Sequence, residues 1–135
     1  MRSIFASLVL IIAGLLGYFL RKRKPDAPVR VGQELPQQIS RNDFSATEKS
    51  WIVLVFTSST CDACKDVARK ALVLESKEVG VQIIDYVDNQ GLHKRYQIDS
   101  VPTTLISDRD GVVMFATVGP ITATDLWAAL AKCRD

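Results

Sequence analysis

Histidine and cysteine are scarce in this chain of 135 residues, which has one histidine and three cysteines. The single histidine, His93, excludes metal sites built from several histidines. Three cysteines cannot all pair within one chain, and a secreted disulfide scaffold would have an even and denser set. Apolar residues make up 47% of the sequence, so we expect one domain with a packed core plus a short appendage.

Acidic residues are absent from residues 1–24, which contain five of the 17 lysines and arginines. The rest of the chain therefore has 12 basic and 15 acidic residues, so the formal charge of +2 hides a slightly acidic domain. Proteins that bind nucleic acid present a basic surface to the phosphates. A nucleic-acid partner is therefore not expected.

The same N-terminal region contains 17 consecutive uncharged residues, Ile4–Leu20. This length is at the short end of what spans a bilayer as a helix. Tyr18 and Phe19 stand near its end, and a basic run, residues 21–24, follows directly. A cleavable signal peptide is the alternative, but no A-x-A-like cleavage site follows and the basic cluster is on the wrong side. We predict a retained transmembrane anchor over residues 1–24.

The charges that flank this anchor predict its orientation. Arg2 precedes the apolar run, whereas four basic residues follow it and Arg30 is close by. Basic residues concentrate on the cytoplasmic side of a membrane span. We therefore predict a single-pass protein of the cell membrane with its domain on the cytoplasmic side, and the extracytoplasmic side is the alternative.

The remaining sequence divides into a linker with an N-terminal extension, residues 25–49, and a domain, residues 50–135. Pro25 and Pro28 keep the linker extended. In the domain, hydrophobic patterns predict alternating strands and helices: strand 51–56, helix 62–79 ended by Gly80, strand 81–87, short helix 90–96, strand 102–107, turn 108–111, strand 112–118 and helix 124–132 begun by Thr122. This order predicts an α/β fold with parallel strands joined by crossovers and a final antiparallel hairpin.

Cys61 and Cys64 follow the predicted buried strand and begin the predicted helix. Free N–H groups and the positive dipole end of a helix stabilise a thiolate, which is the nucleophile in disulfide exchange. Cys61 is then the exposed attacking sulfur, and Cys64, on the same helical face, resolves the mixed disulfide. Two alternatives remain: half of a zinc site, although the chain has no second such pair, and an inert buried pair, although the preceding loop is rich in Ser and Thr.

The stretch WIVLVFTSSTCDACK, followed by SVPTTLI at residues 100–106, resembles the thioredoxin family. The resemblance extends from Trp51 to about Lys132. It implies a thioredoxin-like fold, here with a central mixed four-stranded sheet flanked by helices, and a redox-active Cys61–Cys64 disulfide. It further implies a cis proline facing the cysteines and a set of substrate-binding residues: Val101, Pro102, Thr103 and Gly119.

The resemblance also implies an activity. We expect a membrane-tethered thiol–disulfide oxidoreductase that exchanges disulfides with protein substrates, without a cofactor or a metal. Its partners would be protein thiols and disulfides, together with a reductase or a membrane electron donor. The alternative is a redox-inactive docking module that uses the same fold to hold a partner at the membrane. Residues 31–36 weakly resemble the opening segment of membrane-tethered reductases for cytochrome or amine-dehydrogenase maturation, which usually face outside the cytoplasm.

Several positions depart from thioredoxins proper. Thr60 replaces the tryptophan before the first cysteine, and Asp62-Ala63 replaces the Gly-Pro between the cysteines. Val55 stands where those proteins have a buried acid that aids proton transfer during resolution. Because Asp62 is negative and adjacent to Cys61, it opposes a thiolate there. We therefore expect Cys61 to be less acidic than in strongly oxidising relatives.

The other residues with reactive or ionisable side chains considered as candidates are expected to have structural roles. His93, next to Lys94 and Arg95, is expected to be a solvated polar residue rather than a catalyst. Cys133 is expected to be a surface thiol near a loosely held terminus. Asp85 and Asp88 are expected to cap the loop after the second strand rather than to reach the site.

Overall fold

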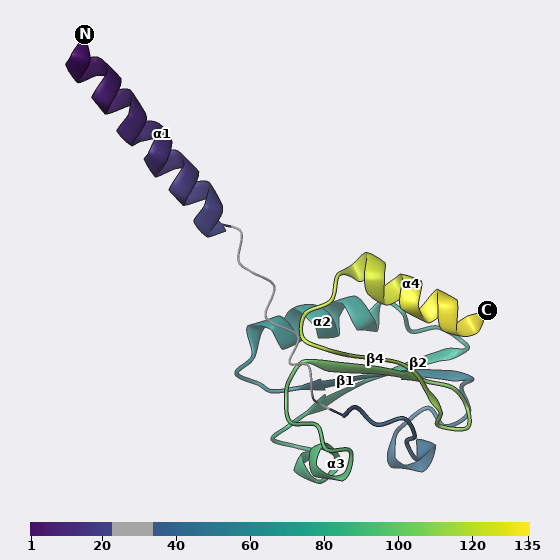
Figure 1. Ribbon diagram of the computed structural model, residues 1–135. Helices are drawn as coiled ribbons and strands as arrows, with labels where there is room; N and C mark the ends of the chain where they lie inside the picture. Colours follow the sequence, from purple (N-terminus) through teal and green to yellow (C-terminus); the bar gives the residue numbers. More distant parts are fainter. Residues whose placement is uncertain (23–33) are drawn as a thin grey trace.

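The computed structural model describes residues 1–22 and 34–135. Its elements (Figure 1) are α1 (Arg2–Lys22), the 3-10 helix η1 (Arg41–Asp43), β1 (Trp51–Thr57), α2 (Asp62–Leu72), β2 (Val79–Asp85), α3 (Gln90–Arg95), β3 (Thr103–Ser107), β4 (Val113–Val118) and α4 (Ala123–Arg134). The predicted linker from Pro25 to Pro28 lies outside the described residues. So do Arg23 and Lys24 of the basic run, Arg30, and residues 31–33.

Helix α1 covers the segment predicted to be the anchor. Its described apolar side chains are exposed, as at Ile4, Leu10 and Leu16, which are 72%, 73% and 62% exposed. Across residues 1–22 and 34–135, no helix has both the length and the apolar character required to cross a membrane. The predicted transmembrane helix is therefore not found.

The domain is built on a four-stranded mixed sheet with the strand order β2-β1-β3-β4. Strand β1 runs parallel to β2 and antiparallel to β3, and β3 pairs antiparallel with β4. Helices α2 and α4 cover one face of the sheet, and α3 lies on the other (Figure 1). The predicted mixed sheet with flanking helices and a terminal antiparallel hairpin is confirmed.

Strand β1 lies between β2 and β3, and it is buried on both faces because α2 and α4 cover one face of the sheet and α3 lies against the other (Figure 1). Successive side chains of a strand point to opposite faces. Leu54 and Phe56 therefore pack into the core on the α3 side, whereas Val53 and Val55 pack into the core under α2 and α4. This two-sided burial explains the continuous apolar run that predicted the strand.

Helix α2 ends at Leu72, so the prediction of a helix up to residue 79 is wrong. Val79 and Gly80 are the first residues of β2, which begins two residues before the predicted strand. Val79 is buried in the sheet, and its apolar side chain fitted the helical spacing by coincidence. Gly80 does not cap a helix; a Cβ there would lie 2.7 Å from the Cβ of Ala46, so only glycine permits this close approach.

The segment before β1 is held against the domain by Arg41, which is buried. Its guanidinium donates to the carbonyl oxygens of Ala46, Lys49 and Asp108 at 3.0, 2.9 and 2.7 Å. These bonds join the 3-10 helix to the loop before β1 and to the β3–β4 turn. Apolar residues of the same segment, Ile39 and Phe44, enter the core on the α3 side.

Candidate active site

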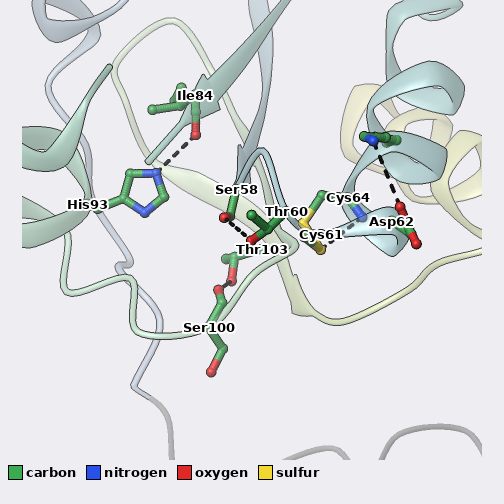
Figure 2. Close-up of a disulfide and its surroundings, with 10 residues drawn as sticks. Ser58, Thr60, Cys61, Asp62, Cys64, Ile84, His93, Ser100 and Thr103 are labelled. Atoms are coloured by element: carbon green, nitrogen blue, oxygen red, sulfur yellow. Dashed lines mark hydrogen bonds and ion pairs between the residues drawn. A yellow bond between two sulfur atoms is a disulfide. The ribbon is translucent and has the colours of Figure 1, made fainter. Parts of the chain in front are cut away.

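Cys61 and Cys64 form a disulfide at the N-terminus of α2 (Figure 2). Their Cα atoms are 5.2 Å apart. Cys61 is partly exposed, whereas Cys64 is 1% exposed. Cys61 is therefore the cysteine of the pair that a protein substrate can approach from solvent.

Cys61 is also the residue that caps α2. Its backbone is extended, with φ −103° and ψ 108°, and its sulfur accepts the N–H of Cys64 at 3.1 Å. A short polar loop leads into it from β1, and within this loop the Cys61 N–H donates to the carbonyl oxygen of Ser58 at 3.1 Å. The hydroxyls of Ser58 and Thr60 are hydrogen-bonded at 3.3 Å. The cap places the sulfur at the positive end of the helix dipole, where a negative charge is stabilised.

Asp62, between the two cysteines in the sequence, points into solvent. Its side chain is fully exposed, and its carboxylate lies 3.8 Å from the ammonium group of Lys65. Solvent and this cation both weaken the field of Asp62 at Cys61. The predicted opposition between Asp62 and a Cys61 thiolate is therefore expected to be small.

Pro102 lies at the same edge of the sheet as the disulfide. Phe56, near the end of β1, pairs with Thr103, the first residue of β3, so the residue before Thr103 lies beside the end of β1. The Val101–Pro102 peptide bond is cis, as the resemblance implied. Gly119 donates its N–H to the carbonyl oxygen of Pro102 at 2.7 Å. The structure thus places the predicted substrate-binding residues together at one edge.

Two of these residues differ in what they offer to a substrate. Among the described residues, no hydrogen bond involves the backbone N–H or C=O of Val101, so neither group is paired within the domain. Thr103 is fully buried, and its hydroxyl donates to the carbonyl oxygen of Ser100 at 2.6 Å (Figure 2). The substrate-binding role of Thr103 stays a prediction, and its hydroxyl is already hydrogen-bonded to the loop before β3.

His93 is buried, so the expectation of a solvated side chain is wrong. It is 2% exposed, and its ring packs edge-on against Phe56 and Tyr86, with centroid distances of 5.0 and 5.2 Å. Its Nε2 lies 3.0 Å from the carbonyl oxygen of Ile84 (Figure 2). In the sequence, His93 stands three residues before the aromatic Tyr96, a spacing that places both side chains on one face of a helix; this is the signal that could have predicted the orientation.

The remaining cysteine and the acidic loop residues lie outside the disulfide site. Cys133 is partly exposed and packs against the core under α2 and α4. Burial raises the pKa of its thiol, which makes it a poor nucleophile near neutral pH. Asp85 accepts the N–H of Val87 at 3.0 Å, so its predicted loop-capping role is confirmed. In the described part of the chain, no cluster of His, Cys, Asp or Glu could hold a metal ion.

A mixed sheet flanked by helices, with a Cys-x-x-Cys disulfide at the start of the helix after β1, defines a thioredoxin-like domain suited to thiol–disulfide redox chemistry. A family model described as a thioredoxin-like domain matches residues 38–134. The chain belongs to this thioredoxin-like family.

Solved structures share the fold at low sequence identity. A mutant form of thioredoxin from Halobacterium salinarum NRC-1 aligns with a TM-score of 0.60 and 22% identity, over 75% of this chain and 95% of that one. A malarial protein aligns with a TM-score of 0.56 and 21% identity, over 62% and 97% of the two chains. Thioredoxin-2, a component of the malaria parasite protein secretion machinery, aligns with a TM-score of 0.55 and 21% identity, over 62% and 82%. No curated protein matches the chain.

Proposed function

We propose that this protein is a membrane-tethered oxidoreductase that exchanges disulfides with protein substrates through Cys61 and Cys64. The observation that carries the proposal is the different exposure of the two cysteines at the start of α2. Cys61, which is partly exposed, caps the helix with its sulfur, and Cys64 is buried. This arrangement suits one attacking and one resolving cysteine.

The exchange takes two steps in the reducing direction. The Cys61 thiolate attacks one sulfur of a substrate disulfide, which forms a mixed disulfide and releases the other substrate sulfur as a thiolate that takes up a proton. Cys64 then loses its proton and attacks the Cys61 sulfur, which closes the Cys61–Cys64 disulfide and releases the second substrate thiol. Two electrons pass from the cysteine pair to the substrate, and the reverse sequence oxidises a dithiol. A reductase or a membrane electron donor returns the pair to the dithiol form.

Protein substrates bind in this proposal as extended segments beside Pro102. The unpaired backbone groups of Val101 offer one donor and one acceptor, as an added strand requires. Gly119 lies at the same edge of the sheet, where its N–H donates to the carbonyl oxygen of Pro102. Specificity would then come from side chains on either side of the substrate cysteine.

The membrane location belongs to the proposal as well. It is supported by the exposed apolar side chains of α1 and by the basic residues that follow them in the sequence. A test replaces Leu10 and Leu16 by lysine and follows the full chain through membrane fractionation. Loss from the membrane fraction is expected, with Val73→Lys, at an exposed apolar residue of the domain, as the control. Full retention of the double variant would contradict the tether.

The cytoplasmic side is proposed from the positive-inside bias. Intact cells that express the Cys133→Ser protein are reduced and then treated with a membrane-impermeant maleimide. Cys61 is expected to react only after the cells are permeabilised. Labelling of Cys61 in intact cells would place the domain on the extracytoplasmic side instead.

The activity is tested by catalysed reduction of insulin disulfides by dithiothreitol, with the full chain in mild detergent. The wild-type protein and Cys133→Ser are expected to accelerate the reaction equally, whereas Cys61→Ser is expected to give the uncatalysed rate. If the wild-type rate equals the Cys61→Ser rate, the docking-module alternative replaces the enzyme.

A further inference from the structure

Thr104 places a hydroxyl group in the core of the domain without a partner. The residue is fully buried and is the second residue of β3, where it pairs with Val55 of β1. Among the described residues, none forms a hydrogen bond with its Oγ1 atom. A buried polar atom without a partner is unfavourable, and each such group in a native structure calls for an explanation, such as a catalytic role or an ordered water.

The Thr104 hydroxyl lies on the same face of the sheet as Cys64. Thr104 and Ile106 are two residues apart on β3, so their side chains share a face, and Ile106 belongs to the core under α2 and α4. Cys64 and Val67 are three residues apart on α2, so they share a helix face, and Val67 belongs to the same core. Both groups therefore face the layer between the sheet and α2.

This layer is a poor environment for the step that Cys64 must perform. To attack the mixed disulfide, its thiol has to lose a proton, and burial disfavours the thiolate that results. The neighbouring side chains of the layer, such as Val55 and Val67, are apolar and supply no hydrogen bond. A hydroxyl on this face can supply one, because it both donates and accepts.

We propose that Thr104 is a positioning residue for the resolving step. In the reduced protein and the mixed disulfide, its hydroxyl holds one water molecule beside the Cys64 sulfur. This water accepts the thiol proton, passes it toward solvent, and then donates a hydrogen bond to the resulting thiolate. The sulfur then attacks Cys61, and the departing substrate thiolate takes up a proton. This role rests on the exchange reaction proposed above.

The experiment separates the two steps with limiting Ellman's reagent, in stopped flow, on the reduced full-length Cys133→Ser protein in mild detergent. Attack by Cys61 on the reagent releases one coloured thiolate, in a phase whose rate depends on the protein and reagent concentrations. Attack by Cys64 on the resulting mixed disulfide releases a second coloured thiolate, in a phase whose rate does not depend on concentration because the step is intramolecular. The rate of each phase is measured from pH 5 to pH 10.

Three substitutions identify the hydroxyl. Thr104→Val removes it at nearly constant volume, and the second phase is expected to slow about tenfold at pH 7, with its pH midpoint shifted upward by about one unit. Thr104→Ser keeps the hydroxyl and is expected to keep the wild-type midpoint. Thr117→Val makes the same change at the residue that pairs with Thr104 on β4, and neither phase is expected to change.

The outcomes distinguish this inference from the proposed function. If the first phase is absent, Cys61 is not the nucleophile and the proposed function fails. If both phases occur and Thr104→Val leaves the midpoint of the second unchanged, the Thr104 inference alone is overturned. A misfolded Thr104→Val protein would be recognised by its thermal unfolding, and Thr104→Ala then takes its place, with an unshifted midpoint again overturning the inference.

Discussion

Gly119 donates its backbone N–H to the carbonyl oxygen of Pro102 across 2.7 Å. This bond ties the segment after β4 to the segment before β3. Because Thr103 pairs with Phe56 at the end of β1, the bond lies at the edge of the sheet that carries the disulfide. The position of the proposed substrate-binding backbone therefore depends on the conformation of Gly119.

Replacing Gly119 by alanine is expected to weaken the binding of protein substrates. Gly119 has φ +98°, which strains an L-residue and costs about 1 kcal/mol, although a Cβ there would have no neighbour within 4 Å. We expect KM for a protein disulfide to rise several-fold, while the rate with Ellman's reagent changes little. Gly111→Ala is the control, because its Cβ would lie 2.0 Å from the carbonyl oxygen of Ile39. It should destabilise the fold more and leave KM unchanged; equal KM values in both variants would contradict the prediction.

Replacing Asp62 by asparagine is expected to make Cys61 more acidic. The change removes a negative charge next to the helix cap, but this charge is exposed and screened. The pH midpoint of Cys61 alkylation should therefore fall by only a few tenths of a unit. Asp125→Asn, in the first turn of α4, is the matched control and should leave the midpoint unchanged. An upward shift in Asp62→Asn would refute the opposition between these two neighbours.

Tyr96 is expected to make the stability of the fold sensitive to alkaline pH. Its hydroxyl accepts the N–H of Ser40 at 3.0 Å and donates to the carboxylate of Asp43. Burial, followed by the bond to Asp43, raises the pKa of Tyr96 above its usual value of 10.0. The folded state therefore holds the proton more tightly than the unfolded chain, so this contribution is complete below pH 10 and is lost as pH rises toward the raised pKa.

Urea unfolding of wild type and Tyr96→Phe checks this prediction. At pH 7 the variant should be less stable by about 1–2 kcal/mol, because it lacks both hydrogen bonds. The difference should shrink between pH 10 and pH 11. A difference that stays constant over this range would show that Tyr96 titrates equally in both states.

Elements that are specified by a local sequence pattern were predicted correctly. The continuous apolar run of β1 and the Asp108–Gly111 turn could both be identified without knowledge of tertiary contacts. Features that depend on contacts with residues far along the chain were missed. The end of α2 depends on β2, where Gly80 packs against Ala46, and the burial of His93 depends on the rings around it.

The candidate site shows the same division. Cys61 and Cys64 were identified from their spacing and from their place after a strand, and Pro102 from its resemblance to a family motif. Thr104 carries no local signal, because its hydroxyl is notable only for lacking a partner inside the folded core. No periodicity or spacing in the chain reports that property.

The measurement that tests the exchange reaction most directly is a covalent trap. Full-length Cys64→Ser in mild detergent is reduced, mixed with a disulfide-bonded peptide and examined by peptide-level mass spectrometry. We predict a mixed disulfide between the peptide and Cys61 that accumulates because the resolving thiol is absent, and no adduct in Cys61→Ser, Cys64→Ser. An adduct found only at Cys133, or none above the double variant, would contradict the assignment of Cys61 as the nucleophile.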